Sequence, residues 1–343
     1  AKNFIQISYP LQSLSGKSLE PCLYIAELLE FKEIEKINKS IETSDFISGI
    51  EQRITYFNKP FVQIDENYFK IFLDRFELAS TALNTYLECP LKFYYEKVLR
   101  IPGARSAPMG FGNAIHKALE NFFKNRTLDP NGPDIDLLLN HFNKAMLAHR
   151  SHFTSREFQN YLEEGKKSLT GFINQHYNNW LDITKMEPEY EFRNRTYRNV
   201  PIIGNIDRVD HYPTNIKVVD YKTGNANSIR DHIKKPSEKN PFGGTYWRQL
   251  IFYSILMDTE SQFNGKMSSG LIYYVNPDNY GKYLFSEIFP STEDKLLVGN
   301  LIVETYAKIQ NKQFFPGCQK PECVWCNFYT SGALIQNDDI EES

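Results

Sequence analysis

The most regular pattern of hydrophobic and polar positions in the chain lies between residues 201 and 222. Apolar and polar residues alternate there in two short runs, Pro201–Asp210 and Ile216–Lys222. The five residues between the runs, His-Tyr-Pro-Thr-Asn at 211–215, have the composition of a turn. Alternation with a period of two is typical of β-strands, so this stretch predicts a β-hairpin.

The turn also predicts which residues of the hairpin face each other. If it is centred between Pro213 and Thr214, Asp207 lies opposite Asp220. Lys222 follows Asp220 by two residues and therefore emerges on the same face of its strand. Directly opposed like charges destabilise a strand pair, because their Cβ atoms are only about 5 Å apart. The same register pairs Val209 with Val218 and Asp210 with Lys217.

Two facing carboxylates need a partner that offsets their repulsion, and a divalent cation is the usual one. Carboxylate oxygens suit Mg²⁺ or Mn²⁺, which keep several waters and commonly bind substrate phosphates. Such an ion activates a water and neutralises charge on a scissile phosphate, and the neighbouring Lys222 can stabilise the attacking species. An exposed hairpin with scattered charges explains the same pattern, so the spacing alone leaves both interpretations open.

The rest of the chain contains both helical and strand-like periodicity. Helices are expected at Leu23–Asn38, Leu78–Arg100 with a break at Pro90, Gly110–Lys124, Asp134–Arg150, Ser155–Trp180, Tyr246–Met257 and Thr292–Lys312. Strands are expected at Ile5–Gly16, Glu187–Arg193, Ser268–Val275 and Lys282–Phe289, with a mobile polar loop at Asn225–Gly244.

The composition is that of a globular protein, with 343 residues of which 41% are hydrophobic and 14% aromatic. No run of about 18 apolar residues occurs, so no membrane span or membrane partner is expected. A net charge of −3 excludes bulk electrostatic capture of nucleic acid, so a DNA enzyme must concentrate its basic residues locally.

Five cysteines are too few for a disulfide-rich secreted protein, and a cytoplasmic location is expected. The chain begins with Ala rather than Met, as expected of a processed protein, a tag scar or a fragment.

The hairpin carries a motif that identifies a family. The sequence GNIDRVD at 204–210, followed by DYKTG at 220–224, resembles the signature G-x-I-D-R-x-D … D-Y-K-T-G of PD-(D/E)XK nucleases of the RecB/AddB type. The resemblance implies an α/β restriction-endonuclease-like fold, a mixed sheet flanked by helices, in a nuclease domain over residues 79–330. Residues 1–78 are then an N-terminal segment, either the end of a helicase-like region or an ordinary extension, and the acidic residues 331–343 a disordered tail.

The same resemblance implies roles for residues on other elements. The frame G-x-x-I-H-x-x-L-E at 112–120 is similar to a family motif whose histidine is a metal ligand, although a lone helical histidine such as His116 is usually structural. Gln249 and Tyr253 match the family's Q-L-x-x-Y motif, which lines the active site. Glu191 lies near a glutamate that the family often has, but an exposed strand face explains both Glu191 and Glu189 equally well.

Together these matches imply a complete active site. The resemblance assigns the binding of Mg²⁺ or Mn²⁺ to His116, Asp207, Asp220 and the carbonyl of Tyr221. Lys222 would assist the attack of water on a DNA phosphodiester, and Gln249 and Tyr253 would orient the lysine or the phosphate.

Cysteines near the end of the chain indicate a second metal site. Cys318, Cys323 and Cys326 follow the pattern C-x4-C-x2-C, and close spacing of this kind lets thiolates reach one ion. Cys89 lies in the context C-P-x-x-F-Y, which also matches the family. Together with the three tail cysteines it forms a set that resembles the iron–sulfur staple of AddB-type nucleases. The family's tail pattern is C-x2-C-x5-C, and its last position falls here on Gly332. A [4Fe–4S] cluster, a Zn²⁺ ion and free thiols therefore all stay open, while Cys22 is expected to be structural.

The function implied is exonuclease processing of DNA ends in recombinational double-strand-break repair. Single-stranded DNA would reach the site from a helicase partner or from a helicase-like N-terminal part. Two alternatives stay open: a non-catalytic module that binds DNA ends, and a stand-alone restriction-type endonuclease.

Overall fold

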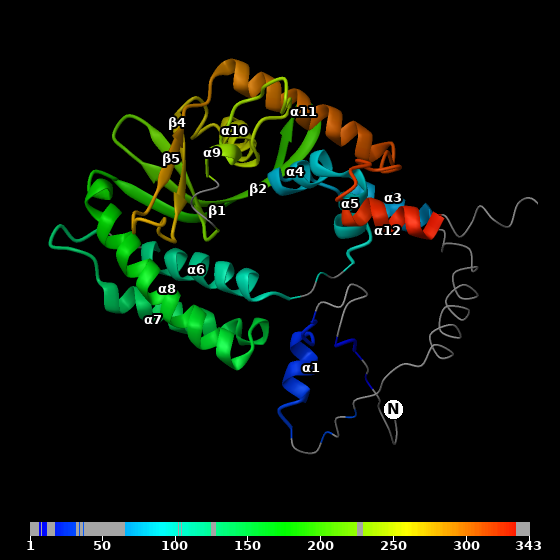
Figure 1. The fold of residues 1–343 in the computed structure, drawn as a ribbon. Coiled ribbons are helices and arrows are strands. Elements are labelled where there is room, and N and C mark those ends of the chain that lie inside the picture. The colour runs from blue at the N-terminus through cyan, green and yellow to red at the C-terminus, as the bar shows by residue number, and fades with distance from the viewer. Residues whose placement is uncertain are drawn as a thin grey trace, which may run out of the picture.

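A mixed five-stranded β-sheet forms the centre of the computed structural model (Figure 1). The structure describes residues 7, 9–11, 18–31, 34, 37, 66–101, 103, 105–124, 128–224 and 229–333. The strands are β1 (Lys185–Tyr197), β2 (Val200–His211), β3 (Ile216–Lys222), β4 (Met267–Tyr274) and β5 (Phe285–Ile288), in that order across the sheet. Only β3 and β4 run parallel, which makes this the mixed sheet of the restriction-endonuclease-like fold.

The hairpin of β2 and β3 has the predicted register. Val209 pairs with Val218, and Asp210 pairs with Lys217. The parallel β3–β4 pair requires a crossover, which helix α10 (Thr245–Asp258) provides. Because β3 and β4 are parallel, their carboxyl ends meet at one edge of the sheet, where β3 ends at Lys222.

Helices α6 (Ala107–Phe123) and α8 (Ser155–His176) cover one face of the sheet, and α7 (Ile135–Ala148) packs against both of them (Figure 1). Helix α6 begins three residues before the predicted position because the hydroxyl of Ser106 accepts a hydrogen bond from the N–H of Met109. Short 3₁₀ turns follow α7 and α8, at Arg150–His152 and Tyr177–Trp180. Aromatic side chains of α6 and α8 form a buried core against β3 and β4.

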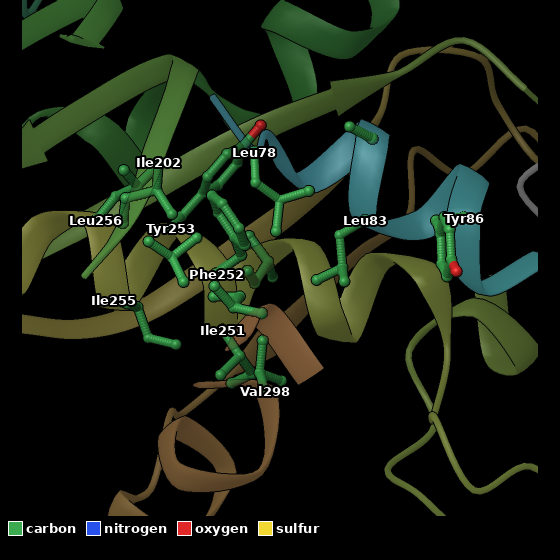
Figure 2. Packing of buried hydrophobic residues seen from close by; sticks show 14 of the residues in the cluster. Leu78, Leu83, Tyr86, Ile202, Ile251, Phe252, Tyr253, Ile255, Leu256 and Val298 are labelled. Carbon is green, nitrogen blue, oxygen red and sulfur yellow. The ribbon is translucent and has the colours of Figure 1, made fainter. Parts of the chain in front are cut away.

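The opposite face is covered by α10, α11 (Thr292–Gln310) and α4 (Ser80–Glu88). Every residue of α10 from Trp247 to Met257 is buried, as expected of a helix packed on all sides. Figure 2 shows the side chains of α4, α10 and α11 packed together in this second core. Helix α11 begins with a capping box in which Ser291 and Asp294 bond each other's backbone N–H.

The segment before α6 is broken at proline, as predicted. Helix α4 ends at Glu88, and α5 (Pro90–Phe93) begins directly at Pro90, which lacks the N–H that a continuing helix would need. A π-helical turn, Tyr94–Val98, follows α5. Two further helices pack beside this segment, α3 (Glu66–Asp74) and α12 (Val324–Ala333).

Some predicted elements differ from the structure where it describes them. Of the helix expected at Leu23–Asn38, the described residues form α1 (Leu23–Leu28) and are no longer helical at 29–31; α1 has no buried residue and no side-chain cap. The polar loop at Asn225–Gly244 contains a short helix, α9 (Ile229–His232). Strand β5 begins three residues later than predicted because residues 282–284 belong to its hairpin connection with β4.

Other expectations fall on parts of the chain that the structure does not describe. Most of Ile5–Gly16 and all of Gln336–Ser343 lie outside the described residues. Among the described helices, none is both long and apolar enough to cross a membrane.

Candidate active site

The site forms around an interruption in the pairing of β1 with β2. Regular pairs lie on both sides of the position where Glu189 meets Asp207, but these two residues do not form a ladder pair themselves. Glu189 has φ of +53°, a left-handed conformation that is strained for a residue with a side chain. Ile206 and Val209, three residues apart, are both buried in the core beside α10, which regular alternation would not allow. Asp207 therefore lies where β2 changes the face to which its side chains point.

Asp207 is held from two sides. One of its oxygens, Oδ2, accepts a hydrogen bond of 2.7 Å from the backbone N–H of Tyr221 on β3. The same oxygen lies 3.3 Å from Nδ1 of His116 on α6. Burial alone would lower the pKa of His116, but the nearby Asp207 carboxylate and its hydrogen bond raise the pKa above its ordinary value.

Glu189 completes a group of three potential ligands. His116, Glu189 and Asp207 each offer an atom within 4.8 Å of the others. The side-chain amide of Asn205 donates a hydrogen bond to Glu189 and fixes its carboxylate. Burial and the neighbouring Asp207 charge raise the pKa of Glu189, as expected when carboxylates share a site.

Asp220 lies beside this group with Lys222 as its partner. Only 2% of Asp220 is exposed, and Nζ of Lys222 is 2.5 Å from its Oδ2. Burial and the Asp207 charge raise the pKa of Asp220 to about 6, although Lys222 opposes the change. The repulsion expected between Asp207 and Asp220 is thus already offset by protein groups, with Lys222 on one carboxylate and His116 and a backbone N–H on the other.

A chain of hydrogen bonds positions Lys222. Its Nζ donates to Oε1 of Gln249 at 3.1 Å, and Nε2 of Gln249 donates to the hydroxyl of Tyr253 at 2.9 Å. Because an ammonium group only donates hydrogen bonds, Lys222 requires the oxygen of the Gln249 amide, and the amide nitrogen is left to donate to Tyr253. Nζ also lies 4.9 Å from the centre of the Tyr246 ring, a cation–π contact.

The structure brings most of the predicted site residues together and separates one. His116, Asp207, Asp220, Lys222, Gln249 and Tyr253 converge as the contacts above describe. Glu191 does not, because its side chain is 54% exposed and pairs with Arg193 at 2.9 Å. Glu189 occupies the place that the sequence assigned to Glu191. Regular alternation puts both glutamates on one face, and only the positive φ of Glu189 distinguishes them.

The donors present fit a hard divalent cation. Carboxylate oxygens with one imidazole suit Mg²⁺ or Mn²⁺ rather than a thiophilic metal. Oδ2 of Asp220 is buried and has no hydrogen bond of good geometry among the described residues, since the approach of Lys222 is close but poorly directed. An acceptor left in this state is available to a cation or to a metal-bound water.

Behind the site, between β2 and the layer of helices α6 and α8, lies a buried ion pair. Arg208 is fully buried and donates two hydrogen bonds to Asp210, at 2.7 and 2.8 Å. A third, at 2.8 Å, goes to the hydroxyl of Tyr221. The guanidinium also contacts the rings of Phe123 and Trp180 at 4.4 and 4.6 Å. The network fixes the side chain of Tyr221, whose backbone N–H bonds Asp207, and it thereby helps to hold the site in place.

The four cysteines predicted to act together are clustered. The Sγ atoms of Cys89, Cys318, Cys323 and Cys326 all lie within 4.8 Å of one another. Cys89 occupies the junction of α4 and α5, and the other three lie in the tail that ends in α12. Burial and the neighbouring thiols raise the pKa of Cys318 to about 12, so a full set of thiolates there needs a cation. Cys22 is exposed and lies outside the cluster.

The family of the chain follows from comparison with known protein families. A model of the PD-(D/E)XK nuclease superfamily matches residues 77–331, and the chain belongs to that superfamily. No curated protein matches the chain.

The solved structures that are similar to the chain include three with low sequence identity. The first is a protein from Eubacterium rectale described as a "putative exonuclease", with 10% identity, a TM-score of 0.48, and coverage of 78% of this chain and 93% of the other. SSO0001 has 15% identity, a TM-score of 0.27 and coverage of 70% and 93%. VC1899 from Vibrio cholerae has 9% identity, a TM-score of 0.22 and coverage of 68% and 56%.

Proposed function

We propose that this nuclease is a Mg²⁺- or Mn²⁺-dependent deoxyribonuclease that degrades DNA from an end. The observation that carries the proposal is the convergence of His116, Glu189 and Asp207 beside the Asp220–Lys222 pair. This arrangement provides both a ligand set for a hard cation and a fixed ammonium group next to it. A module that only binds DNA ends has no use for such a pair.

In this proposal each side chain has a defined task. His116, Glu189, Asp207 and Asp220 would hold the ion, with the Tyr221 carbonyl as a further ligand. A bound Mg²⁺ or Mn²⁺ supplies Lewis-acid chemistry, since it lowers the pKa of water and neutralises charge on the scissile phosphate.

Lys222 has a separate task toward the substrate. A lysine ammonium has three donors, of which one is directed at Gln249, while the charge lies in close contact with Asp220. The ammonium can therefore still donate to a phosphate oxygen or to the attacking water. The positive charge of Lys222 is secured because Asp220 and Asp207 raise its pKa, although burial opposes the change.

The biological setting proposed rests on the RecB/AddB resemblance of the hairpin motif. We infer that the enzyme processes DNA ends in recombinational double-strand-break repair, with single-stranded ends delivered by a helicase subunit or a helicase-like region. The net charge of −3 supports a partner, because the chain by itself has little bulk attraction for DNA.

The cysteine cluster is proposed to hold a structural metal that joins the tail to the α4–α5 junction. Two Sγ–Sγ distances, from Cys326 to Cys89 and to Cys318, are 3.6 and 3.7 Å. A tetrahedral zinc ion with bonds of about 2.3 Å has edges of about 3.8 Å, so this spacing favours a single ion. A [4Fe–4S] cluster, which the resemblance implies, is larger and would hold the four sulfurs farther apart. Elemental analysis and the brown colour of an iron–sulfur protein distinguish the two.

A cleavage assay on matched DNA substrates tests the proposal. End-labelled linear single strands, linear duplex and closed circular DNA are incubated with Mg²⁺, Mn²⁺ or chelator. An exonuclease degrades linear DNA only, and only with metal. Cutting of closed circles would instead indicate an endonuclease. If the wild-type protein binds DNA ends but cleaves none, and so behaves like the Lys222→Ala variant, the proposal is overturned in favour of a binding module.

A further inference from the structure

The connection between β4 and β5 projects beyond the edge of the sheet where Lys222 ends β3. Its first residue, Val275, donates its backbone N–H to the carbonyl of Lys222 at 2.9 Å. The amide of Asn276 donates to the carbonyl of Thr223 at 3.3 Å. On its other side, Tyr283 is buried against α8, where Gln175 bonds both its N–H and its carbonyl. The connection is therefore anchored directly to the catalytic strand.

The tip of this connection is a closed and rigid turn. The side chain of Asp278 accepts hydrogen bonds from the N–H groups of Tyr280 and Lys282, both at 2.9 Å. Two backbone bonds, from Asp278 to Lys282 and from Gly281 to Asp278, close the same loop. Gly281 has φ of +79°, a conformation that glycine adopts without strain. The backbone of this turn is therefore held in one conformation.

What the turn presents is an unsupported aromatic ring. Tyr280 is 89% exposed, the highest fraction among the large apolar side chains of the described residues. Within that part of the chain its ring makes no contact with another aromatic ring. Lys282, two residues further on, is also exposed and has no ion-pair partner among the described residues. A free ring beside a free cation is the combination with which proteins hold single-stranded nucleic acid.

We propose that Tyr280 stacks on a base of single-stranded DNA that runs to or from the site, and that Lys282 contacts the adjoining phosphate. This proposal rests on the proposed function. Tyr280 lies five residues from Val275, so the Cα atoms of these two residues are at most about 17 Å apart. Because Val275 bonds the carbonyl of Lys222, the stacked base lies a few nucleotides from the scissile phosphate. Duplex DNA offers no free base face at this point, so the contact selects single strands.

The test is binding of a labelled oligothymidine of about 20 nucleotides, measured by fluorescence anisotropy in chelator so that no cleavage occurs. Tyr280→Ala is expected to weaken binding about 5- to 100-fold, and Tyr280→Phe to leave it unchanged. Binding to a blunt duplex should be the same in all three proteins. Lys282→Gln should reduce the dependence of log affinity on log salt by about 0.7.

Phe289→Ala is the matched control. Phe289 is 65% exposed and follows β5 at the opposite edge of the sheet, so its loss removes an exposed ring without touching the site. If the Tyr280→Ala variant binds single strands with the same affinity as the Phe289→Ala variant, the role of Tyr280 is overturned and the nuclease proposal is left intact. If the wild-type protein neither binds nor cleaves DNA, the proposed function fails, and the stacking role fails with it.

Discussion

Replacing Arg208 by methionine isolates the contribution of the buried ion pair behind the site. The guanidinium makes two hydrogen bonds to Asp210 and one to the hydroxyl of Tyr221. It also lies against the rings of Phe123 and Trp180. Methionine is apolar and unbranched, so it fills much of the same space but leaves the Asp210 carboxylate buried and unpaired.

The magnitude follows from the desolvation of that carboxylate. Breaking a buried ion pair by removing one partner costs about 3–5 kcal/mol, because the remaining charge is uncompensated. Folded proteins are stable by only about 5–15 kcal/mol, so the Arg208→Met variant should lose a large part of its stability. At about 2–4 °C per kcal/mol for a domain of this size, the melting temperature should fall by roughly 10 °C.

The loss should depend on pH in a defined direction. Burial raises the pKa of Asp210 in the folded protein, even though Arg208 opposes the change. Without Arg208 the pKa rises further, so the folded state binds a proton that the unfolded state has released. The unfolding free energy of the variant therefore decreases as pH rises above about 3.9, the ordinary pKa of aspartate. The difference from wild type should be smaller near pH 4 than at neutral pH.

Urea denaturation followed by circular dichroism and tryptophan fluorescence measures the effect. The double variant Arg208→Met, Asp210→Leu is the control, since it removes both charges and should recover much of the lost stability. An unfolding free energy within about 1 kcal/mol of wild type for the single variant would refute the reasoning. So would a double variant that is no more stable than the single one.

Other predictions concern the two proposed metal sites. Asp207→Asn should abolish cleavage and weaken Mn²⁺ binding in calorimetry, since it removes a charged ligand; wild-type turnover would contradict this assignment. Lys222→Ala should keep Mn²⁺ binding but lose turnover, because an ammonium group cannot ligate a metal; loss of both would make the lysine structural. Glu189→Gln should weaken Mn²⁺ binding while Glu191→Gln leaves it unchanged, and equal effects would remove Glu189 from the ligand set. Cys323→Ser should reduce the zinc or iron content and lower the melting temperature, since metal ligation couples to folding; unchanged metal content would exclude this cysteine as a ligand.

The sequence alone determined the features that depend on neighbouring residues. The register of the β2–β3 hairpin follows from the turn and from alternation, so the facing positions of Val209 and Val218 could be predicted. The helix break at Pro90 follows from the missing N–H of proline. The family motif likewise marked Asp207, Asp220 and Lys222, because those residues lie close together on two adjacent strands.

Tertiary structure decided which charged groups meet across the molecule. The hairpin register places Lys217 opposite Asp210, but Lys217 bonds Glu287 of β5 at 2.9 Å, while Asp210 pairs with Arg208. Burial by α6 and α8 makes the arginine partner necessary, because an unpaired carboxylate there would be strongly destabilising. No local pattern specifies which face the helices will cover.

Tertiary structure also decided that Glu189 rather than Glu191 lies in the site, and that Cys89 meets the tail. Strand periodicity treats the two glutamates alike, and only the interruption opposite Asp207 turns one of them to the site. Cys89 reaches Cys326, 237 residues away, because α12 packs on the α5 segment, with Trp325 stacked 5.0 Å from Tyr95. Periodicity and turn chemistry are properties of a short stretch of backbone, whereas these contacts depend on the burial of surfaces from distant parts of the chain.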